Sequence, residues 1–262
     1  MTKLAYPMYD LHRPDTVALL GALQELLAAR GLAAEAIFPV DDLDTHWQQP
    51  DVLLSQTCGY PLATRLMAVQ PLGCFHYLAT GCEGHLYRSL LVARQADSGK
   101  ALADFRHRRA VCNSPDSQSG YNVLRYMTAM LPGEGRFFSH LLFSGSHRQS
   151  LVALGQQQAD IAAIDCVTYA LLQRHQPALL AGLTVIAQSP LAPGLPLITA
   201  QGTNAETRAL VQAALQQLVS DRRYREVCDA ALVGDFCPVT RRDYDWLLHW
   251  RDAATARGVT RL

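Results

Sequence analysis

A loop rich in hydroxyl side chains separates an apolar run ending at Val111 from a helical pattern beginning at Tyr121. The residues directly before that helix are Ser117, Gln118, Ser119 and Gly120. The first turn of a helix has backbone N–H groups without partners and carries the positive end of the helix dipole. Glycine also lets backbone approach a ligand closely. The loop therefore predicts a seat for a phosphate-like or carboxylate group. A plain helix N-cap is the alternative.

Two further polar residues follow later apolar runs. His147 comes after the run 137–143, and Asp165 ends the run 159–165. A nearby anion would favour the protonated form of His147, which would then be a strong donor. Asp165 is suited to an amino or guanidino group on the far end of a ligand. Each residue also stands at the start of a predicted helix, so capping is the alternative for both.

Polar and aromatic residues also mark strand exits in the first third of the chain. Tyr9 follows the first strand, and Gln56, Thr57 and Tyr60 lie at the end of a buried strand. Ligands of open α/β sheets bind at the carboxyl ends of the strands, where all these exits fall. Tyr9, Tyr60 and Tyr87 each offer an apolar ring with a polar tip, as pocket walls do. Plain packing is the alternative for each.

Strands and helices alternate along most of the chain, which predicts an α/β fold with a parallel sheet covered on both faces. The strands are predicted at 3–9, 36–40, 51–56, 74–78, 86–93, 109–113, 137–143, 159–165, 183–188 and 197–199. The helices are predicted at 16–30, from 61 onward, and at 148–157, 166–174, 205–220 and 241–257. This order predicts two lobes, 1–85 plus 190–262 and 86–189, with two hinge crossings and a ligand cleft.

Composition excludes several classes of function. The chain has 262 residues, with 23 basic and 23 acidic side chains and so no formal net charge. This balance argues against a nucleic-acid footprint and an anionic membrane surface. No apolar run reaches the roughly 18 residues that membrane insertion needs. The first ten residues lack the apolar stretch of a signal peptide, which predicts a cytoplasmic protein. A leader removed beforehand would instead indicate the periplasm.

The cysteines and histidines predict neither a cofactor nor a metal. The seven cysteines are scattered and form no CxxC pair, and free thiols favour a reducing compartment. His76, Cys82, Glu83 and His85 lack the ligand spacing of a metal motif. The basic run Arg106–Arg109 is predicted to be a solvated face.

Two nucleophile arrangements are open as enzyme alternatives. Ser146, His147 and Asp165 have the residue types of a hydrolase triad, but no G-x-S-x-G elbow accompanies them. Cys58 stands at a strand exit near a helix start, a position that lowers a thiol pKa.

Four segments together resemble the phosphate/phosphonate-binding, periplasmic-binding-protein-like family of ABC transporters. They are residues 53–62, 103–121, 144–151 and 158–167, and the resemblance runs from the first strand to about residue 200. It implies a type II binding-protein fold, a small oxyanion ligand and an ABC permease as partner.

The resemblance also implies roles for individual residues. The family's anion loop corresponds to Ser117–Gly120, with Gln118 where the family often has threonine. Its cleft histidine, aromatic and acidic positions correspond to His147, Tyr87 and Asp165, and Tyr9 and Gln56–Tyr60 match the first-lobe side. We therefore expect a solute-binding protein that captures a phosphonate- or phosphate-like ligand by hinge closure. The alternative is a cytoplasmic enzyme or ligand sensor on the same fold, of the cofactor-biosynthesis type.

Overall fold

The structure, a computed structural model, describes all 262 residues and divides into two compact units. The first unit contains residues 1–86 and 193–245, and the second contains residues 87–192 and 246–262. The chain therefore passes between the units three times, where the sequence predicted two crossings. Residues 246–262, assigned to the first lobe by sequence, group with the second unit instead.

The first unit is built on a six-stranded sheet with the order β13-β4-β12-β3-β1-β2. Its strands are β1 (Thr2–Leu4), β2 (Ala34–Ala36), β3 (Val52–Gln56), β4 (Gln70–Tyr77), β12 (Pro196–Thr199) and β13 (Val233–Cys237). β1 pairs in parallel with β2 and β3, whereas β12 and β13 pair in antiparallel fashion. The predicted parallel sheet is thus a mixed one, because the chain returns to it after leaving the second unit.

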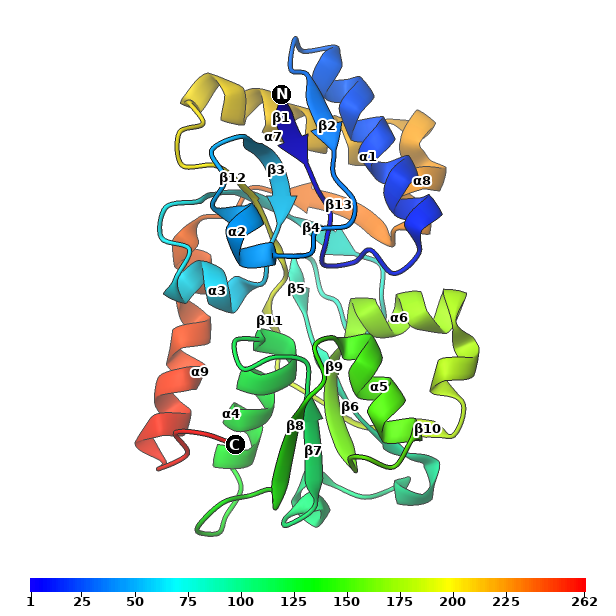
Figure 1. Cartoon of the computed structure of the whole chain (residues 1–262), viewed down its shortest axis with the longest axis vertical. Helices are drawn as coiled ribbons and strands as arrows, with labels where there is room; N and C mark the ends of the chain where they lie inside the picture. The colour runs from blue at the N-terminus through cyan, green and yellow to red at the C-terminus, as the bar shows by residue number, and fades with distance from the viewer. The chain divides into compact units, whose positions relative to one another are not determined.

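Five helices accompany this sheet: α1 (Arg13–Ala28), α2 (Leu43–Trp47), α3 (Gly59–Thr64), α7 (Ala205–Ser220) and α8 (Arg225–Ala230). α1 begins three residues before the predicted start, because Pro14 fits the first turn of a helix. α1 and α8 lie beside each other (Figure 1), and Tyr224, just before α8, donates from its hydroxyl to Glu25 of α1. α7 has the bounds predicted from the sequence.

The second unit has a five-stranded sheet with the order β10-β6-β9-β7-β8. Its strands are β6 (Ser89–Arg94), β7 (Arg109–Cys112), β8 (His140–Phe143), β9 (Ile161–Asp165) and β10 (Leu183–Gln188). β7 pairs in parallel with β8 and β9, and β6 is antiparallel to β9 and β10. Short strands β5 (Leu86–Tyr87) and β11 (Ala192–Pro193) pair where the chain passes between the units.

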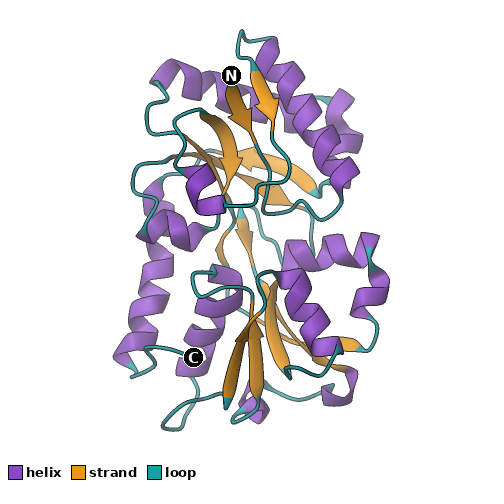
Figure 2. Ribbon diagram, viewed as in Figure 1, coloured by secondary structure: helices purple, strands orange, loops and turns teal.

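Helices flank the second sheet: α4 (Val123–Ala129), α5 (His147–Gly155), α6 (Cys166–His175) and α9 (Asp245–Ala256). α4 connects β7 to β8, and α5 connects β8 to β9, so the chain moves along the sheet in opposite directions through the two helices. Because such connections are right-handed, the two helices lie on opposite faces of the sheet. Figure 2 shows the two helices on either side of the strands. The segment Arg106–Arg109, predicted to be a solvated face, also forms ion pairs, because the partly exposed Arg108 donates to Asp97 and Arg109 to Asp160.

α9 is held in the second unit by specific contacts with α4. Trp250 stacks on Tyr126 with ring centroids 4.8 Å apart and an interplanar angle of 8°. The buried Arg125 donates to the Val259 carbonyl and, over 2.6 Å, to the Thr255 hydroxyl. These contacts explain why the C-terminal segment groups with the second unit. The longest helices, α1 and α7, each have 16 residues and are too short to cross a membrane.

Candidate ligand-binding site

Three strand exits of the second unit bring the predicted residues to one edge of the sheet. β8, β7 and β9 are parallel neighbours, so the segments that follow them begin at the same edge. The loop after β7 carries Ser119, and the loop after β8 leads to His147. The Ser119 Oγ and His147 Nε2 atoms lie 2.8 Å apart, in hydrogen-bond contact. The structure thus joins two residues that the sequence places in separate segments.

The hydroxyl-rich loop becomes a π-helical turn, Gln118–Asn122, that continues directly into α4. Ser117 is its N-cap, because its hydroxyl oxygen accepts from the Gly120 N–H over 3.0 Å. A Cβ at position 120 would lie 1.9 Å from the Asn113 Oδ1 atom, so the turn packs tightly at this glycine. The capping alternative therefore holds for Ser117, while Ser119 has no capping role among its described hydrogen bonds and faces His147.

His147 is the first residue of α5, and the N-cap of that helix is Ser146, which accepts from the Gln149 N–H. Burial lowers the pKa of His147 to about 4, an effect that the Ala163 backbone only partly offsets. In the ligand-free chain the imidazole is therefore neutral at pH 7. The protonated donor was expected beside a bound anion and stays a prediction for that state, whereas in the ligand-free chain the neutral ring shares a hydrogen bond with Ser119.

Asp165 caps α6. Its Oδ1 atom accepts from the Val167 and Thr168 N–H groups at 2.7 and 3.0 Å, and Oδ2 accepts from the Thr168 hydroxyl. The side chain is buried, with 3% of the residue exposed. Both carboxylate oxygens thus serve the first turn of the helix, as the capping alternative predicted. These hydrogen bonds fix the junction between β9 and α6, at the same edge of the sheet as Ser119 and His147.

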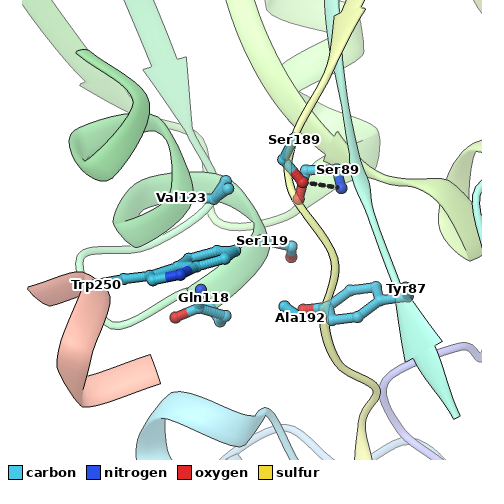
Figure 3. Close-up of a pocket in the computed structure, with 8 residues that line it drawn as sticks. All are labelled: Tyr87, Ser89, Gln118, Ser119, Val123, Ser189, Ala192 and Trp250. Carbon is cyan, nitrogen blue, oxygen red and sulfur yellow. Dashed lines mark hydrogen bonds between the residues drawn. The ribbon is translucent and has the colours of Figure 1, made fainter. Parts of the chain in front are cut away.

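A narrow pocket opens beside Ser119, within the second unit (Figure 3). It is lined by Tyr87, Ser89, Gln118, Ser119, Val123, Ser189, Ala192 and Trp250. Its empty volume is about 140 Å³ including the open mouth, but the gap between the side chains is too narrow to admit a water molecule in the ligand-free chain. Hydroxyl, amide and aromatic groups share the lining, so a wider form of this pocket would offer several hydrogen-bonding groups to a small ligand.

Sequence reasoning identified Tyr87, Gln118 and Ser119 in this lining but missed the other members. Ser89 and Ser189 are joined by two hydrogen bonds of 2.8 Å, from the Ser89 N–H to the Ser189 Oγ atom and from the Ser189 N–H to the Ser89 carbonyl. A serine that interrupts a buried apolar strand was the available signal for Ser89. Trp250 gave no signal, because its helix reaches this pocket only through the third crossing between the units.

The predicted residues of the first unit form a separate, mainly aromatic group at the exits of β1 and β3. Gln56 is fully buried, and its amide donates to the Tyr77 hydroxyl over 2.8 Å. Tyr9 packs edge-on against Tyr77, with ring centroids 5.0 Å apart. Thr57 is also fully buried, whereas Tyr60 is half-buried in the first turn of α3. Tyr77, which joins Tyr9 to Gln56, was not predicted.

Neither nucleophile arrangement suggested by the sequence is assembled as a catalytic site. Ser146 and Asp165 both cap helices, and His147 turns its Nε2 atom to Ser119 instead. The His147 Nδ1 atom is buried and has no carboxylate partner to orient the ring. Cys58, the N-cap residue of α3, is buried with 7% exposure, whereas reactive cysteines are usually accessible.

The matching family model is described as the periplasmic substrate-binding protein of a phosphonate ABC transporter, and it covers residues 44–244. Among solved structures, a binding-protein component of an ABC phosphonate transporter from Pseudomonas aeruginosa is similar, with a TM-score of 0.78 and 18% identity over 98% of this chain and 88% of that one. PhnD1 from Prochlorococcus marinus in complex with methylphosphonate is also similar, with a TM-score of 0.76 and 13% identity over 97% of this chain and 98% of that one.

A third similar structure is XAC2383 from Xanthomonas citri bound to ATP, with a TM-score of 0.70 and 14% identity over 98% of each chain. At these identities the three structures show a shared fold, the type II binding-protein fold that the sequence predicted. No curated protein sequence matches this chain.

Proposed function

Because the chain belongs to the family of periplasmic substrate-binding proteins of phosphonate ABC transporters, we propose that it captures a phosphonate and that the pocket of the second unit holds the phosphonate oxygens. A phosphonate group offers three acceptor oxygens, and the pocket presents the Ser119 hydroxyl and the Gln118 amide beside the start of a helix. The helix dipole favours an anion at that end. The bound methylphosphonate of PhnD1 is in line with this ligand class.

The observation that carries the proposal is the hydrogen bond between Ser119 and His147. In the proposed complex, the His147 Nε2–H group donates to the Ser119 oxygen, which leaves the Ser119 hydroxyl hydrogen free to donate to a phosphonate oxygen. The neutral imidazole therefore orients the serine rather than supplying charge. Hydrogen bonds to a charged partner contribute about 1.5–3 kcal/mol, so this single donor is important for affinity.

The proposal is tested by calorimetric titration with methylphosphonate, phosphate and sulfate. We expect Ser119→Ala to weaken methylphosphonate binding about 10- to 100-fold, in line with the loss of about 1.5–3 kcal/mol. His147→Gln keeps a side-chain donor near the position of Nε2 and is expected to lose less affinity than His147→Ala. Ser139→Ala is the matched control, because this serine of the same unit is exposed and donates only to the Arg108 carbonyl.

Two results would contradict the proposal in different ways. If no oxyanion binds to the unaltered chain, the assigned ligand class is wrong. If methylphosphonate binds equally well to the Ser119→Ala variant and to the Ser139→Ala control, the ligand lies elsewhere and the pocket of the second unit is not the site.

Closure on the ligand, delivery to an ABC permease and a periplasmic location complete the proposed function. Support for them comes from the family description, which names a transporter and the periplasm. The cytoplasmic location expected from the sequence has no such support. Closure is tested by small-angle scattering, in which methylphosphonate should reduce the radius of gyration of the chain and leave that of the Ser119→Ala variant unchanged.

The proposed role is binding without catalysis. Its support is the family, which consists of transporter components, together with the capping roles of Ser146 and Asp165. Incubation with methylphosphonate should leave the ligand chemically unchanged, as phosphorus NMR of the recovered ligand would show. Release of phosphate by the unaltered chain, abolished by Cys58→Ala, would favour the enzyme alternative.

A further inference from the structure

Three side chains that commonly bind metals meet in the first unit, whereas the proposed phosphonate pocket belongs to the second. His76 lies on β4, His85 lies in the turn that follows β4, and Cys237 is the last residue of β13. One ligand atom from each lies within 4.8 Å of the other two. The sequence placed the two histidines near each other but paired them with Cys82 and Glu83 instead of the distant Cys237.

The strand register explains why Cys237 joins the histidines. β4 and β13 are antiparallel neighbours (Figure 1), with Cys74 opposite Cys237 and His76 opposite Asp235. Side chains two residues apart on a strand share a face, so His76 and Cys237 are diagonal neighbours on one face of the sheet. This relation is built into the sheet and does not depend on the conformation of a loop.

The backbone of His85 is also held against this sheet. Its carbonyl accepts from the Gly194 N–H over 2.8 Å, and a Cβ at position 194 would lie 2.7 Å from the same carbonyl oxygen. Glycine is therefore what permits this close approach. Reciprocal backbone hydrogen bonds between Glu83 and Leu86 close the turn on either side of His85. All three candidate ligands thus come from segments whose backbone is fixed.

The surroundings of His76 match those of a metal-bound histidine. Its Nε2 atom is buried and has no hydrogen-bond partner, and its Nδ1 atom lies 3.9 Å from a carboxylate oxygen of Asp235. Metal-binding histidines usually direct their second ring nitrogen to a carboxylate, which orients the ring. The side chain of His76 is 27% exposed as a whole, so it lies at the surface of the unit although its Nε2 atom is covered.

We propose that His76, His85 and Cys237 bind a divalent transition metal ion of the zinc class. Two imidazoles and a thiolate are ligands that Zn²⁺ prefers over hard cations. With bond lengths of about 2.0–2.3 Å, tetrahedral ligand atoms are about 3.3–3.8 Å apart, so small side-chain rotations close the observed group around an ion. Water takes the fourth position, as it does in open zinc sites.

The charge environment supports this assignment. The Asp235 and Asp243 carboxylates act electrostatically on Cys237, and Asp243 also acts on His85. These carboxylates favour an incoming cation, which would displace the thiol proton as metals do.

The test is a titration of the full, reduced and metal-free chain with Zn²⁺ and Co²⁺, with Mg²⁺ as the hard-cation comparison. We expect one equivalent of Zn²⁺ to bind and to raise the melting temperature. Co²⁺ should show thiolate-to-metal charge-transfer absorption, which Cys237→Ser abolishes. Reduction is required because Cys74 lies opposite Cys237 in the register, and a disulfide between them would remove the ligand.

Variants distinguish this site from incidental zinc binding. Replacing any one of the three ligands should lower zinc affinity at least 100-fold. Residues that contact a ligand without touching the metal typically contribute 10- to 100-fold, so Asp235→Asn should lower zinc affinity about 10-fold. Cys82→Ser and the exposed-histidine variant His249→Gln are the matched controls and should bind zinc normally. Equal affinity in the Cys237→Ser variant and in the controls would overturn the proposal, as would binding of Mg²⁺ as strong as that of Zn²⁺. Methylphosphonate titration of the same variants tests the other pocket independently.

Discussion

In each unit, a strand buried along its whole length follows an aspartate and ends in a polar residue. In the first unit Asp51 precedes β3, which ends at Gln56, and in the second Asp160 precedes β9, which ends at Asp165. Both strands pair in parallel with a neighbour inside the sheet. The two units therefore place different side chains around the same two strand ends, and the differences show which end serves structure and which serves function.

At the amino ends, the two aspartates have unequal environments. Asp160 accepts from Arg94 at 2.6 Å and from Arg109 at 3.0 Å, and its side chain is 9% exposed. Asp51 pairs with Lys3 at 3.0 Å, and its side chain is 40% exposed. Burial opposes ionisation of Asp160, but hydrogen bonds from Arg109 and Arg94 outweigh it and keep the pKa of Asp160 well below its usual range.

At the carboxyl ends, the contrast concerns ligand chemistry. The second unit gathers hydroxyl, imidazole and amide groups at helix starts, whereas the first gathers tyrosines around a buried glutamine. Each unit also has an imidazole–hydroxyl pair, the part-buried His147 with Ser119 and the buried His46 with Ser55. Of these four residues, only Ser119 lines the pocket. The same sheet plan thus supports an anion site in one unit and an aromatic cluster in the other.

The largest expected effect is a loss of folding stability when Asp160 is replaced, compared with a small loss when Asp51 is replaced. Asp160→Asn should lower the free energy of unfolding by about 1.5–3 kcal/mol, because the buried Asp160 side chain loses its charge-assisted hydrogen bonds from the partly exposed Arg94 and Arg109. Asp51→Asn should cost about 0–1 kcal/mol, as expected for an exposed ion pair. Urea unfolding followed by circular dichroism measures both. Equal costs would show that the two positions are equivalent despite their different burial.

The second prediction concerns the two imidazole–hydroxyl pairs and pH. His147 has a folded pKa of about 4, below its ordinary value of 6.5. Between these values the unfolded chain binds more protons, so stability falls as pH falls below about 6.5. At about 1.4 kcal/mol per pH unit, His147 should account for roughly 2 kcal/mol lost between pH 7 and pH 5.

This loss should be absent from His147→Gln in urea unfolding at the two pH values. Burial and Lys3 also lower the pKa of His46, with Asp51 opposing them. His46→Gln should therefore flatten the pH dependence in the same direction but by less. A larger effect from His46 than from His147 would reverse the comparison between the pairs.

The third prediction tests the aromatic cluster of the first unit. Tyr77→Phe should cost at least about 1 kcal/mol of unfolding free energy, because the buried Gln56 amide loses the Tyr77 hydroxyl as its acceptor. Tyr60→Phe is the control and should change stability by less than about 0.5 kcal/mol. Phosphonate binding should survive both changes if the oxygens are held by the second unit alone.

The smallest expected effect is that of the helix cap in the second unit. Ser117→Ala should cost about 1 kcal/mol, the usual value of an N-cap, because the Gly120 N–H loses its acceptor. Its effect on methylphosphonate affinity should be smaller than that of Ser119→Ala. If Ser117→Ala weakens methylphosphonate binding more than Ser119→Ala does, the Ser117 hydroxyl itself contacts the ligand. The assignment of capping to Ser117 and of ligand contact to Ser119 would then be wrong.

The sequence predicted local features well where local chemistry decides them. α7 and β10 have their predicted bounds, because a long amphipathic pattern and an apolar run each specify one structure. The loop at Ser117–Gly120 and its proximity to His147 also followed from strand order. The choice between cap and ligand contact at Asp165 did not, since it depends on where the carboxylate points.

Long-range pairings were the part that sequence could not supply. β13 was missed, and with it the placement of Cys237 beside His76 and His85, because Val233–Cys237 is short and has no alternating pattern. The predicted helix at 241–257 was largely right, but its membership of the second unit depends on the stacking of Trp250 on Tyr126. Contacts between segments this far apart leave no periodic signal in the chain.

The tryptophan positions give the molecule a built-in optical readout. Of the three tryptophans, Trp47 is buried in the first unit, where its indole N–H donates to the Gln56 carbonyl. Trp250 borders the pocket of the second unit, and Trp246 is 54% exposed. In a Trp246→Phe background, each unit would hold one emitter. Fluorescence of Trp47→Phe and Trp250→Phe derivatives would then report separately on ligand arrival in one unit and on melting of each unit.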